Sequence, residues 1–383
     1  MKNYITVFLK DNPHTLLKFL RSIVLSKNII DYKTLAYFKN AFFENRYLVF
    51  LSLGYYLLTY IISWIIGKKI TGDLIFYYKF FLNFLFPFFV LILSSSTIFY
   101  MILNIGIGYK CLKGIPNFFF QLIKRYLSIS NIARFIIIFS IFPLFMCSYS
   151  SIKQSVPFIT NFSSDLFLYN LDKVIHFNQS PWEIYDIFVG YPPVTKLIDF
   201  CYLAWGLIFI YSLLYMACCE DRILRLRFFF SLAFCWIFIG NILAGLLASA
   251  GPCYFSQTTG INPSPYADLF SYLRTVPGIK AVNVQDALWK AFKNEVFMPL
   301  GGISAMPSMH VSIAVLLALL YKNFNRWMGW AMTIFAIIIQ IGSVHLGWHY
   351  AVDGYLSGVV TIGIWLIVKN FLNNKGRESF SPD

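Results

Sequence analysis

Three of the five histidines in the sequence lie in its last third, beside apolar runs: His310, His345 and His349. An imidazole can serve as a nucleophile, as a general acid or base, or as a metal ligand near neutral pH. Ionisable side chains at the depth of a membrane cost free energy, so their presence there indicates function. These three are therefore the first candidates for chemistry, whereas we expect His14 to be solvated and His176 to lie at a membrane interface.

The first of two polar clusters runs from Gly301 to His310 and reads GGISAMPSMH. Gly302 allows close backbone approach, Pro307 suits the first turn of a helix, and Ser304 or Ser308 can cap that helix. A helix N-terminus offers free N–H groups and the positive end of a dipole, which together bind anions. We expect these residues to contact an anion at which His310 points. A capped helix start with an interfacial histidine is an equally good interpretation of this cluster alone.

The second cluster runs from Gly342 to Asp353 and contains two histidines and an aspartate spaced four residues apart. In a continuous helix, His345, His349 and Asp353 would share one face. Asp353, one turn from His349, can accept the proton of one ring nitrogen and leave the other as a nucleophile or base. Ser343 and His345 would then line the substrate site. The alternative is a structural pair in which His349 only satisfies a buried carboxylate.

Together the two clusters hold the groups that phosphoryl transfer through a phosphohistidine requires: an anion site, a nucleophilic histidine, a second histidine to protonate the leaving oxygen, and an aspartate. This chemistry needs neither a metal nor another cofactor. A competing hypothesis is a zinc site formed by His345, His349 and Asp353, because His-x-x-x-His on a helix is a zinc spacing. That hypothesis is weaker, because no Glu follows His345 and the sequence from Pro307 to His310 would have no role.

The elements that position these clusters must be membrane-spanning helices. Hydrophobic residues make up 58% of the 383 positions and charged residues only 13%, against about 45–50% and about 25% in soluble domains. Too few charged side chains remain to cover a water-facing surface, which excludes soluble and disordered classes and predicts an all-α polytopic membrane protein. About eight runs are long and apolar enough to cross a bilayer: 48–67, 81–103, 133–151, 197–219, 228–250, 305–321, 327–345 and 349–368.

The basic residues are distributed unequally between the two sides of these eight runs. The formal net charge is +14, and all of this excess falls on segments that lie on the side of the two termini. The positive-inside rule therefore predicts cytoplasmic termini and a site on the non-cytoplasmic side. Topology and anionic lipid headgroups explain the charge, so no nucleic-acid partner is expected. A composition rich in Lys, Asn, Ile and Phe, with short soluble parts, points to a bacterial inner membrane.

Two long segments on the non-cytoplasmic side, 152–196 and 251–304, are predicted to form short helices that cap the site at the membrane interface. Residues 1–47 carry charges through their apolar stretch. We therefore expect them to form an amphipathic cytoplasmic segment rather than a signal peptide. Residues 371–383 are expected to form a cytoplasmic tail.

The sequences PSMH at 307–310 and HYAVD at 349–353 resemble two motifs of the type 2 phosphatidic acid phosphatase superfamily, Pro-Ser-Gly-His and His-x-x-x-Asp. The resemblance implies that His349 is the nucleophile, that Asp353 orients it, and that His310 is the general acid for the leaving group. It also implies a site on the non-cytoplasmic side of the membrane, in agreement with the charge distribution.

The resemblance covers the last six predicted helices, residues 130–370, as a six-helix catalytic core. Residues 48–129 lie outside it and would form two extra membrane-spanning helices and a cytoplasmic loop.

Three positions depart from the phosphatase pattern. No Lys-x6-Arg-Pro motif precedes His310, and the corresponding segment, 251–255, reads GPCYF. Ser343 stands where many family phosphatases have Arg, and Met309 stands where they have Gly. In these departures the sequence is similar to the branch of inositol phosphorylceramide synthase and sphingomyelin synthase. That branch moves a phospho-headgroup from one lipid to another alcohol.

The resemblance thus implies an inositolphosphotransferase-like membrane enzyme that takes a phospholipid or lipid phosphate as substrate and an alcohol or ceramide as acceptor. A lipid phosphate phosphatase, acting on phosphatidic acid or an isoprenoid phosphate, is the alternative. A transporter is a third hypothesis, but the sequence lacks the paired broken helices that it predicts. The sequence neither indicates an oligomeric state nor assigns the cations that neutralise the phosphate; those available are Arg274, Lys280, Lys290 and Lys293.

Overall fold

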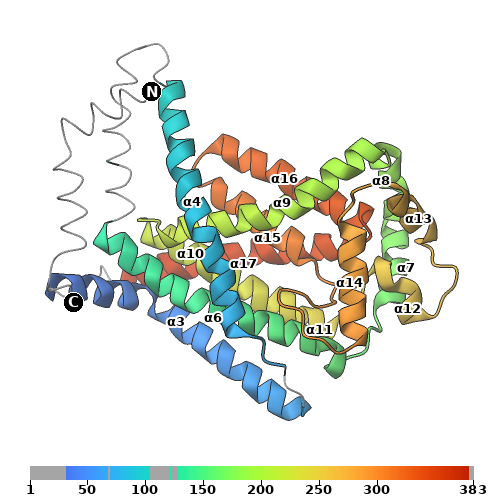
Figure 1. The fold of residues 1–383 in the computed structure, drawn as a ribbon, viewed down its shortest axis with the longest axis horizontal. Coiled ribbons are helices and arrows are strands. Elements are labelled where there is room, and N and C mark those ends of the chain that lie inside the picture. Colours follow the sequence, from blue (N-terminus) through green and yellow to red (C-terminus); the bar gives the residue numbers. More distant parts are fainter. Residues whose placement is uncertain (1–31, 68–69, 104–120, 122–127, 379–383) are drawn as a thin grey trace.

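The computed structural model describes residues 32–67, 70–103, 121 and 128–378, and every regular element among them is a helix (Figure 1). The predicted all-α fold is confirmed for this part of the chain. Most of the predicted amphipathic N-terminal segment, residues 1–31, lies outside the described residues, and so do most of the loop at 104–127 and the end of the C-terminal tail.

Within the described residues, six helical segments are long and apolar enough to cross a membrane, which makes the chain a polytopic membrane protein. The remaining two predicted spans correspond to α15 (Met309–Tyr321) and to part of α4 (Leu74–Leu103). The shorter apolar stretch found in α4, Leu74–Leu85, overlaps its predicted span of 81–103 only at residues 81–85, so the count of eight stays a prediction. The six are α3 (Tyr32–Ile66), α6 (Ile129–Ile159), α9 (Pro192–Ala217), the α10–η2–α11 segment (Arg222–Leu246), α16 (Arg326–His345) and α17 (Ala351–Glu378).

Polar side chains set the starts of several helices by accepting hydrogen bonds from otherwise unpaired N–H groups. Ser128 caps α6 through the N–H of Asn131 at 3.3 Å, and Asp221 caps α10 through the N–H of Leu224 at 3.0 Å. The predicted cap at Ser308 is confirmed, since its Oγ accepts from the N–H of Val311 at 3.5 Å. Ser308 is thus the N-cap and α15 begins at Met309, so the expectation that Pro307 lies in the first turn of this helix is wrong: Pro307 precedes the cap.

Helix α15 lies at the centre of the bundle. It packs against α9, α10, η2, α16 and α17 (Figure 1), and its Ile313, Ala314, Leu316 and Leu317 are fully buried. Helix α3 lies at the outside, mainly against α6, and α4 crosses α6 and α9. The N-terminal helices therefore add a second layer to one flank of the central bundle.

The two long segments between spans form short helices that gather at one end of the bundle, on the right in Figure 1. They are α7 (Asp165–Ile175), α8 (Pro181–Val189), α12 (Phe255–Thr259), α13 (Ala267–Thr275) and α14 (Ala281–Lys293). This confirms that both segments contain short helices. One boundary differs from the prediction: α6 continues to Ile159, beyond the expected end at 151, because its last turns turn polar side chains toward a cavity rather than toward lipid.

Candidate active site

His349 lies in a short turn between α16 and α17. The chain reverses at Gly347, whose φ is +72°, a backbone conformation that favours glycine. A Cβ at this position would also lie 2.4 Å from the ring of Phe270. The turn is then tied back to α16, because the carbonyl oxygen of Ser343 accepts from the N–H groups of Trp348 and His349, both at 3.0 Å. The backbone of His349 is therefore held on both sides.

The expectation that His345, His349 and Asp353 share one face of a continuous helix is wrong. Helix α16 ends at His345 and α17 begins at Ala351, so the turn at Gly347 separates the two histidines. The Nε2 of His345 instead lies 3.0 Å from Oγ1 of Thr195 on α9. Residue spacing alone did not reveal the reversal of the chain.

Asp353 is fully buried beneath His349. Its Oδ2 lies 3.3 Å from Nδ1 of His349 and accepts from the N–H of Tyr350 at 3.0 Å. A carboxylate on Nδ1 fixes the tautomer in which that nitrogen carries the proton. The arrangement leaves Nε2 of His349 as the nitrogen with a lone pair for chemistry.

Two carboxylates of α7, one of the short helices at the end of the bundle, accept hydrogen bonds from this turn. The sequence analysis did not identify them as site residues. Asp172 accepts from the N–H groups of Ala351 at 2.8 Å and Val352 at 3.0 Å, and so caps α17. Asp165 accepts from the Tyr350 hydroxyl at 3.0 Å and from the N–H of Gly251 at 2.9 Å. A signal was present in the sequence: two aspartates seven residues apart lie on one face of an otherwise apolar helix.

His310 lies in the first turn of α15, as the sequence predicts. Its ring packs against Tyr202 and Trp205 of α9, with centroids 4.4 Å and 4.5 Å away. The rings of His310 and His349 face each other with centroids 6.2 Å apart. Two residues that are about 40 positions apart in the sequence thus meet across one space.

That space is a cavity of about 500 Å³ lined by both histidines. Its walls come from α4, α6, α9, α14, α15, η2 and the segment that precedes α15, and most of the lining is apolar, with Phe81, Leu203 and Phe209 among the contributors. A pocket that combines apolar walls with a few convergent polar groups is typical of ligand sites.

The other predicted site residues fall into two groups. Gly302 lines the cavity together with the histidines. Pro307, Ser308, Ser343 and His345 do not line it. Ser308 has a supporting position, since its N–H donates to the carbonyl oxygen of Asp353 at 3.2 Å and joins the start of α15 to α17. The Ser343 hydroxyl donates to the carbonyl oxygen of Gln340 at 2.7 Å.

The four cations available in the 251–304 segment lie outside the cavity. Arg274 pairs with Asp286 at 3.1 Å on the exposed face of the cap, the ammonium of Lys293 lies over the Trp289 ring, and Lys280 and Lys290 are exposed. Among the described residues that line the cavity, the one lysine or arginine is Lys153 of α6. The sequence analysis missed it because the predicted span ended two residues earlier.

The charge of Lys153 affects the histidine in the turn. Burial, and secondarily the positive charge of Lys153, lower the pKa of His349 to about 3, against the smaller opposing effect of a backbone hydrogen bond with Ala305. A neutral imidazole is the form that can attack phosphorus. The lowered pKa therefore keeps His349 in the neutral form, which is the form that a nucleophilic role requires.

The clusters do not form a metal site of the predicted kind. In the part of the chain that the structure describes, no three His, Cys, Asp or Glu side chains come close enough together to hold a metal ion. His345, one of the three ligands that the zinc hypothesis needs, is engaged with Thr195 outside the cavity.

A comparison with protein-family models matches residues 166–368, more than half of the chain, to a model described as the PAP2 superfamily. The chain belongs to the PAP2 superfamily. Comparisons with curated proteins and with solved structures gave no significant match. Membership and the apolar helices together make this a membrane protein of a lipid phosphatase and phosphotransferase family.

The PAP2-matched region runs from the start of α7 into α17 and hence includes both cavity histidines. Helices α3, α4 and α6 precede the match, yet α4 and α6 supply part of the cavity wall, including Phe81 and Lys153. The cavity in this PAP2 protein is therefore completed by residues outside the matched region.

The departure at Met309 from the PAP2 motif has a local explanation. Its side chain lines the cavity and lies against Gly240 in the π-helical segment η2 (Cys235–Leu243). A Cβ at Gly240 would lie 3.0 Å from Sδ of Met309 and 2.6 Å from the ring of Tyr149. Gly240 thus provides the room that a Met in place of Gly requires.

Proposed function

We propose that this protein is a lipid phosphotransferase that works through a phosphohistidine and moves a phospho-headgroup from one lipid to an alcohol acceptor. The observation that carries the proposal is the pair of histidine rings 6.2 Å apart across one cavity, with a carboxylate on Nδ1 of one of them. An interval of this size can hold a phosphoryl group between a nucleophile and a proton donor, with one ring on each side of phosphorus.

In the proposed first step, Nε2 of His349 attacks phosphorus and the bond from phosphorus to the leaving oxygen breaks. His310, protonated when the substrate is bound, transfers its proton to that oxygen, so the lipid leaves as a neutral alcohol. Asp353 stabilises the positive charge that develops on the His349 ring. In the second step the now neutral His310 takes the proton of the acceptor hydroxyl, whose oxygen attacks phosphorus and releases His349.

The walls of the cavity support a lipid substrate. Phe80 and Phe81 of α4, Leu203 and Phe209 of α9 and Ile313 of α15 offer apolar surface next to the histidines. Burial of apolar chains against such surface stabilises a complex by about 25 cal/mol per Å². A phosphate bound between the histidines would place its hydrocarbon part along this wall.

Transfer is favoured over hydrolysis by the segment that replaces the first phosphatase motif. Tyr254 of the 251–255 segment lines the cavity, and its ring stacks on Trp289 with centroids 4.8 Å apart. Together with Trp205, Trp236 and Trp348 it gives the cavity an aromatic wall that favours a lipid-borne acceptor over water. On the sidedness of the site, we retain the prediction that the cavity opens on the non-cytoplasmic side and that both termini are cytoplasmic.

The experiment that tests this function is incubation of purified protein in detergent or nanodiscs with radiolabelled lipid phosphates and phosphodiesters, with and without ceramide, diacylglycerol or a free alcohol. We expect a labelled headgroup to appear on the acceptor, and a labelled protein band in the absence of acceptor that is stable to base and labile to acid. His349→Ala should abolish both. Release of phosphate at the same rate with and without acceptor would identify a hydrolase instead.

A further inference from the structure

The surroundings of Lys153 are unusual for a lysine. It lies on the last turns of α6, its side chain is partly buried, and it lines the cavity together with His310 and His349. Within the described part of the chain, no hydrogen bond or ion pair engages its ammonium group. A cation held partly out of water without an anionic partner costs free energy.

The carboxylates nearest to this cavity are already engaged. Asp199, which lines the cavity, accepts from the N–H groups of Lys280 at 2.9 Å and Ala281 at 3.1 Å. Asp353 lies beneath His349 and does not line the cavity. Among the described residues, Lys153 therefore forms no ion pair with a carboxylate, and its charge acts on the histidines of the cavity.

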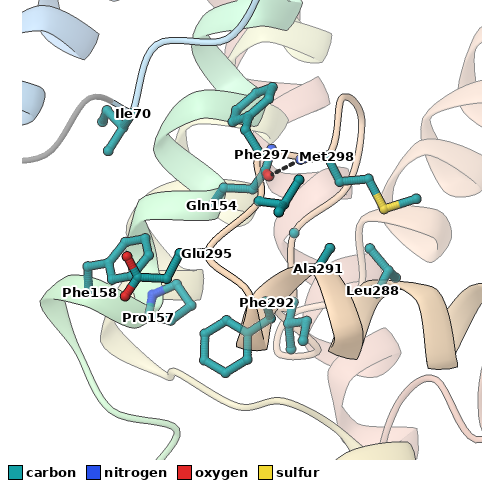
Figure 2. Close-up of a pocket in the computed structure, with 13 residues that line it drawn as sticks. Ile70, Gln154, Pro157, Phe158, Leu288, Ala291, Phe292, Glu295, Phe297 and Met298 are labelled. Atoms are coloured by element: carbon teal, nitrogen blue, oxygen red, sulfur yellow. Dashed lines mark hydrogen bonds between the residues drawn. The ribbon is translucent and has the colours of Figure 1, made fainter.

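The position of Lys153 is fixed by the segment that precedes α15. Gln154, the next residue on α6, accepts from the N–H of Met298 at 2.9 Å, which holds this segment against the helix (Figure 2). Gly302 then passes over the lysine with a φ of +112°, and a Cβ there would lie 3.3 Å from Cγ of Lys153 and 3.0 Å from Cγ of Gln154. Only glycine fits this crossing without displacing the lysine.

The same segment is a shared wall between two cavities. Figure 2 shows the neighbouring one, of about 330 Å³, which Gln154 enters. Met298, Gly302 and Ile303 line both cavities. Two successive residues of α6 therefore line different cavities. Gln154 binds the shared segment and lines the smaller cavity, whereas Lys153 lines the larger cavity together with the histidines.

We infer that Lys153 binds the phosphate group of the substrate between His310 and His349 and supplies the positive charge that the phosphatase-type motifs would otherwise provide. The inference rests on the proposed function. It assigns a phosphate-binding residue to a helix that precedes the PAP2-matched region. A bound phosphoryl group would remove the cost of the unbalanced ammonium, and the ammonium would in turn stabilise charge on the phosphoryl oxygens during transfer.

The test is the binding of inorganic phosphate to the full-length protein in detergent, measured by the rise of its thermal midpoint with phosphate concentration. We expect Lys153→Gln to weaken phosphate binding about 10- to 100-fold, the size associated with one charge-assisted hydrogen bond. Lys153→Arg should restore part of the affinity. Lys290→Gln, which removes an exposed lysine from the cap, is the matched control and should bind phosphate as the wild type does.

A purely structural role gives a different result. If Lys153 only supported the fold, Lys153→Gln would lower the thermal midpoint in the absence of phosphate, and the Arg variant would not recover phosphate affinity. Equal phosphate affinity of the wild type and Lys153→Gln would overturn the inference while leaving the proposed function intact. Absence of any phosphate binding by the wild type would also overturn the inference. Failure of the proposed function is distinguished by the transfer experiment, in which the wild type would then give neither a labelled acceptor nor a labelled protein band.

Discussion

His310 and His349 differ in their surroundings, and the surroundings suit different steps of one reaction. His349 is anchored by Asp353 through Nδ1 at 3.3 Å and is tied to α16 through its backbone. His310 packs against the aromatic rings of Tyr202 and Trp205, and no side-chain hydrogen bond holds it among the residues that the structure describes. An anchored ring suits in-line attack, whereas a ring held by stacking can change its protonation state without breaking a fixed hydrogen bond. Each role leads to a prediction.

The first prediction concerns the dependence of kcat/KM on pH, which reports ionisation in the free enzyme. Burial and Lys153 lower the pKa of His349 to about 3, so His349 stays neutral as the pH falls from 7 to 5. The acidic limb that belongs to the nucleophile should therefore lie well below the usual histidine value of about 6.5. The groups that face this ring are Asp353, His310 and Lys153.

Removal of the Lys153 charge should shift that limb in a defined direction. Without the ammonium the protonated form of His349 is less disfavoured, so its pKa rises and the acidic limb of Lys153→Gln should move to higher pH. Lys290→Gln should leave the limb where it is. A nucleophile limb near pH 6.5 in the wild type, unmoved in Lys153→Gln, would contradict this description of the site.

The second prediction separates a proton donor from a phosphate ligand. General acid catalysis contributes about 10²–10⁴-fold, so His310→Ala should slow the loss of an alkoxide leaving group by that factor. With a nitrophenyl phosphate, whose leaving group needs little protonation, the same variant should lose much less. The measurement is kcat on both substrates. Equal losses would show that His310 binds phosphate instead of donating a proton.

The positions of the helices and turns were predicted from the sequence only in part. Apolar runs predicted the positions of the long helices, and Ser308 before an apolar run predicted the start of α15. The break between α16 and α17 agrees with the separate predicted spans 327–345 and 349–368. The continuation of α6 to Lys153 was missed, because a polar cavity wall does not appear in hydrophobic periodicity. The support from Asp165 and Asp172 was missed because it depends on a tertiary contact between α7 and α17.

The third prediction tests that support. Asp172→Ala leaves the buried N–H groups of Ala351 and Val352 without their acceptor, which costs about 1–3 kcal/mol of stability. It also loosens the start of α17, which carries Asp353. We expect a lower thermal midpoint and a fall in kcat of about 10²-fold, the effect of a displacement of about 1 Å in an active site.

Two further variants complete this test. Asp172→Asn keeps one acceptor oxygen and should lose less of both quantities than Asp172→Ala. Asp268→Ala, an exposed aspartate in the first turn of α13, should leave kcat unchanged. Normal turnover in Asp172→Ala would show that α7 is not needed to position the histidine and its aspartate.

At the scale of the whole molecule, the distribution of charge and the fold agree on which segments lie together. Glu44 and Arg225, both predicted on the side of the termini, form an ion pair at 2.6 Å that joins α3 to α10. The short helices α7, α8, α12, α13 and α14 gather at the other end of the bundle, next to the histidines. In the described part of the chain, this ion pair and the short helices therefore lie at opposite ends of the bundle.

The fourth prediction assigns these ends to the two sides of the membrane. In a variant whose native cysteines are replaced, Asp268→Cys on the cap should react with an impermeant maleimide added to intact cells. Asn374→Cys, near the end of α17, should react only after the cells are opened. Labelling of Asn374→Cys from outside would reverse the predicted orientation and place the cavity on the cytoplasmic side.

The short length of α15 has a mechanical consequence for the membrane around the protein. Its 13 residues span about 20 Å at about 1.5 Å per residue, whereas the hydrocarbon layer is about 30 Å thick. Its neighbour α16 has 20 residues and can cross the whole layer. If the end of α15 at Tyr321 lies at one boundary of the hydrocarbon layer, His310 at its start lies about 10 Å inside the other boundary. A lipid phosphate would then have to move inward or the bilayer would have to thin to reach it, so we expect turnover to fall as the thickness of the bilayer in nanodiscs increases.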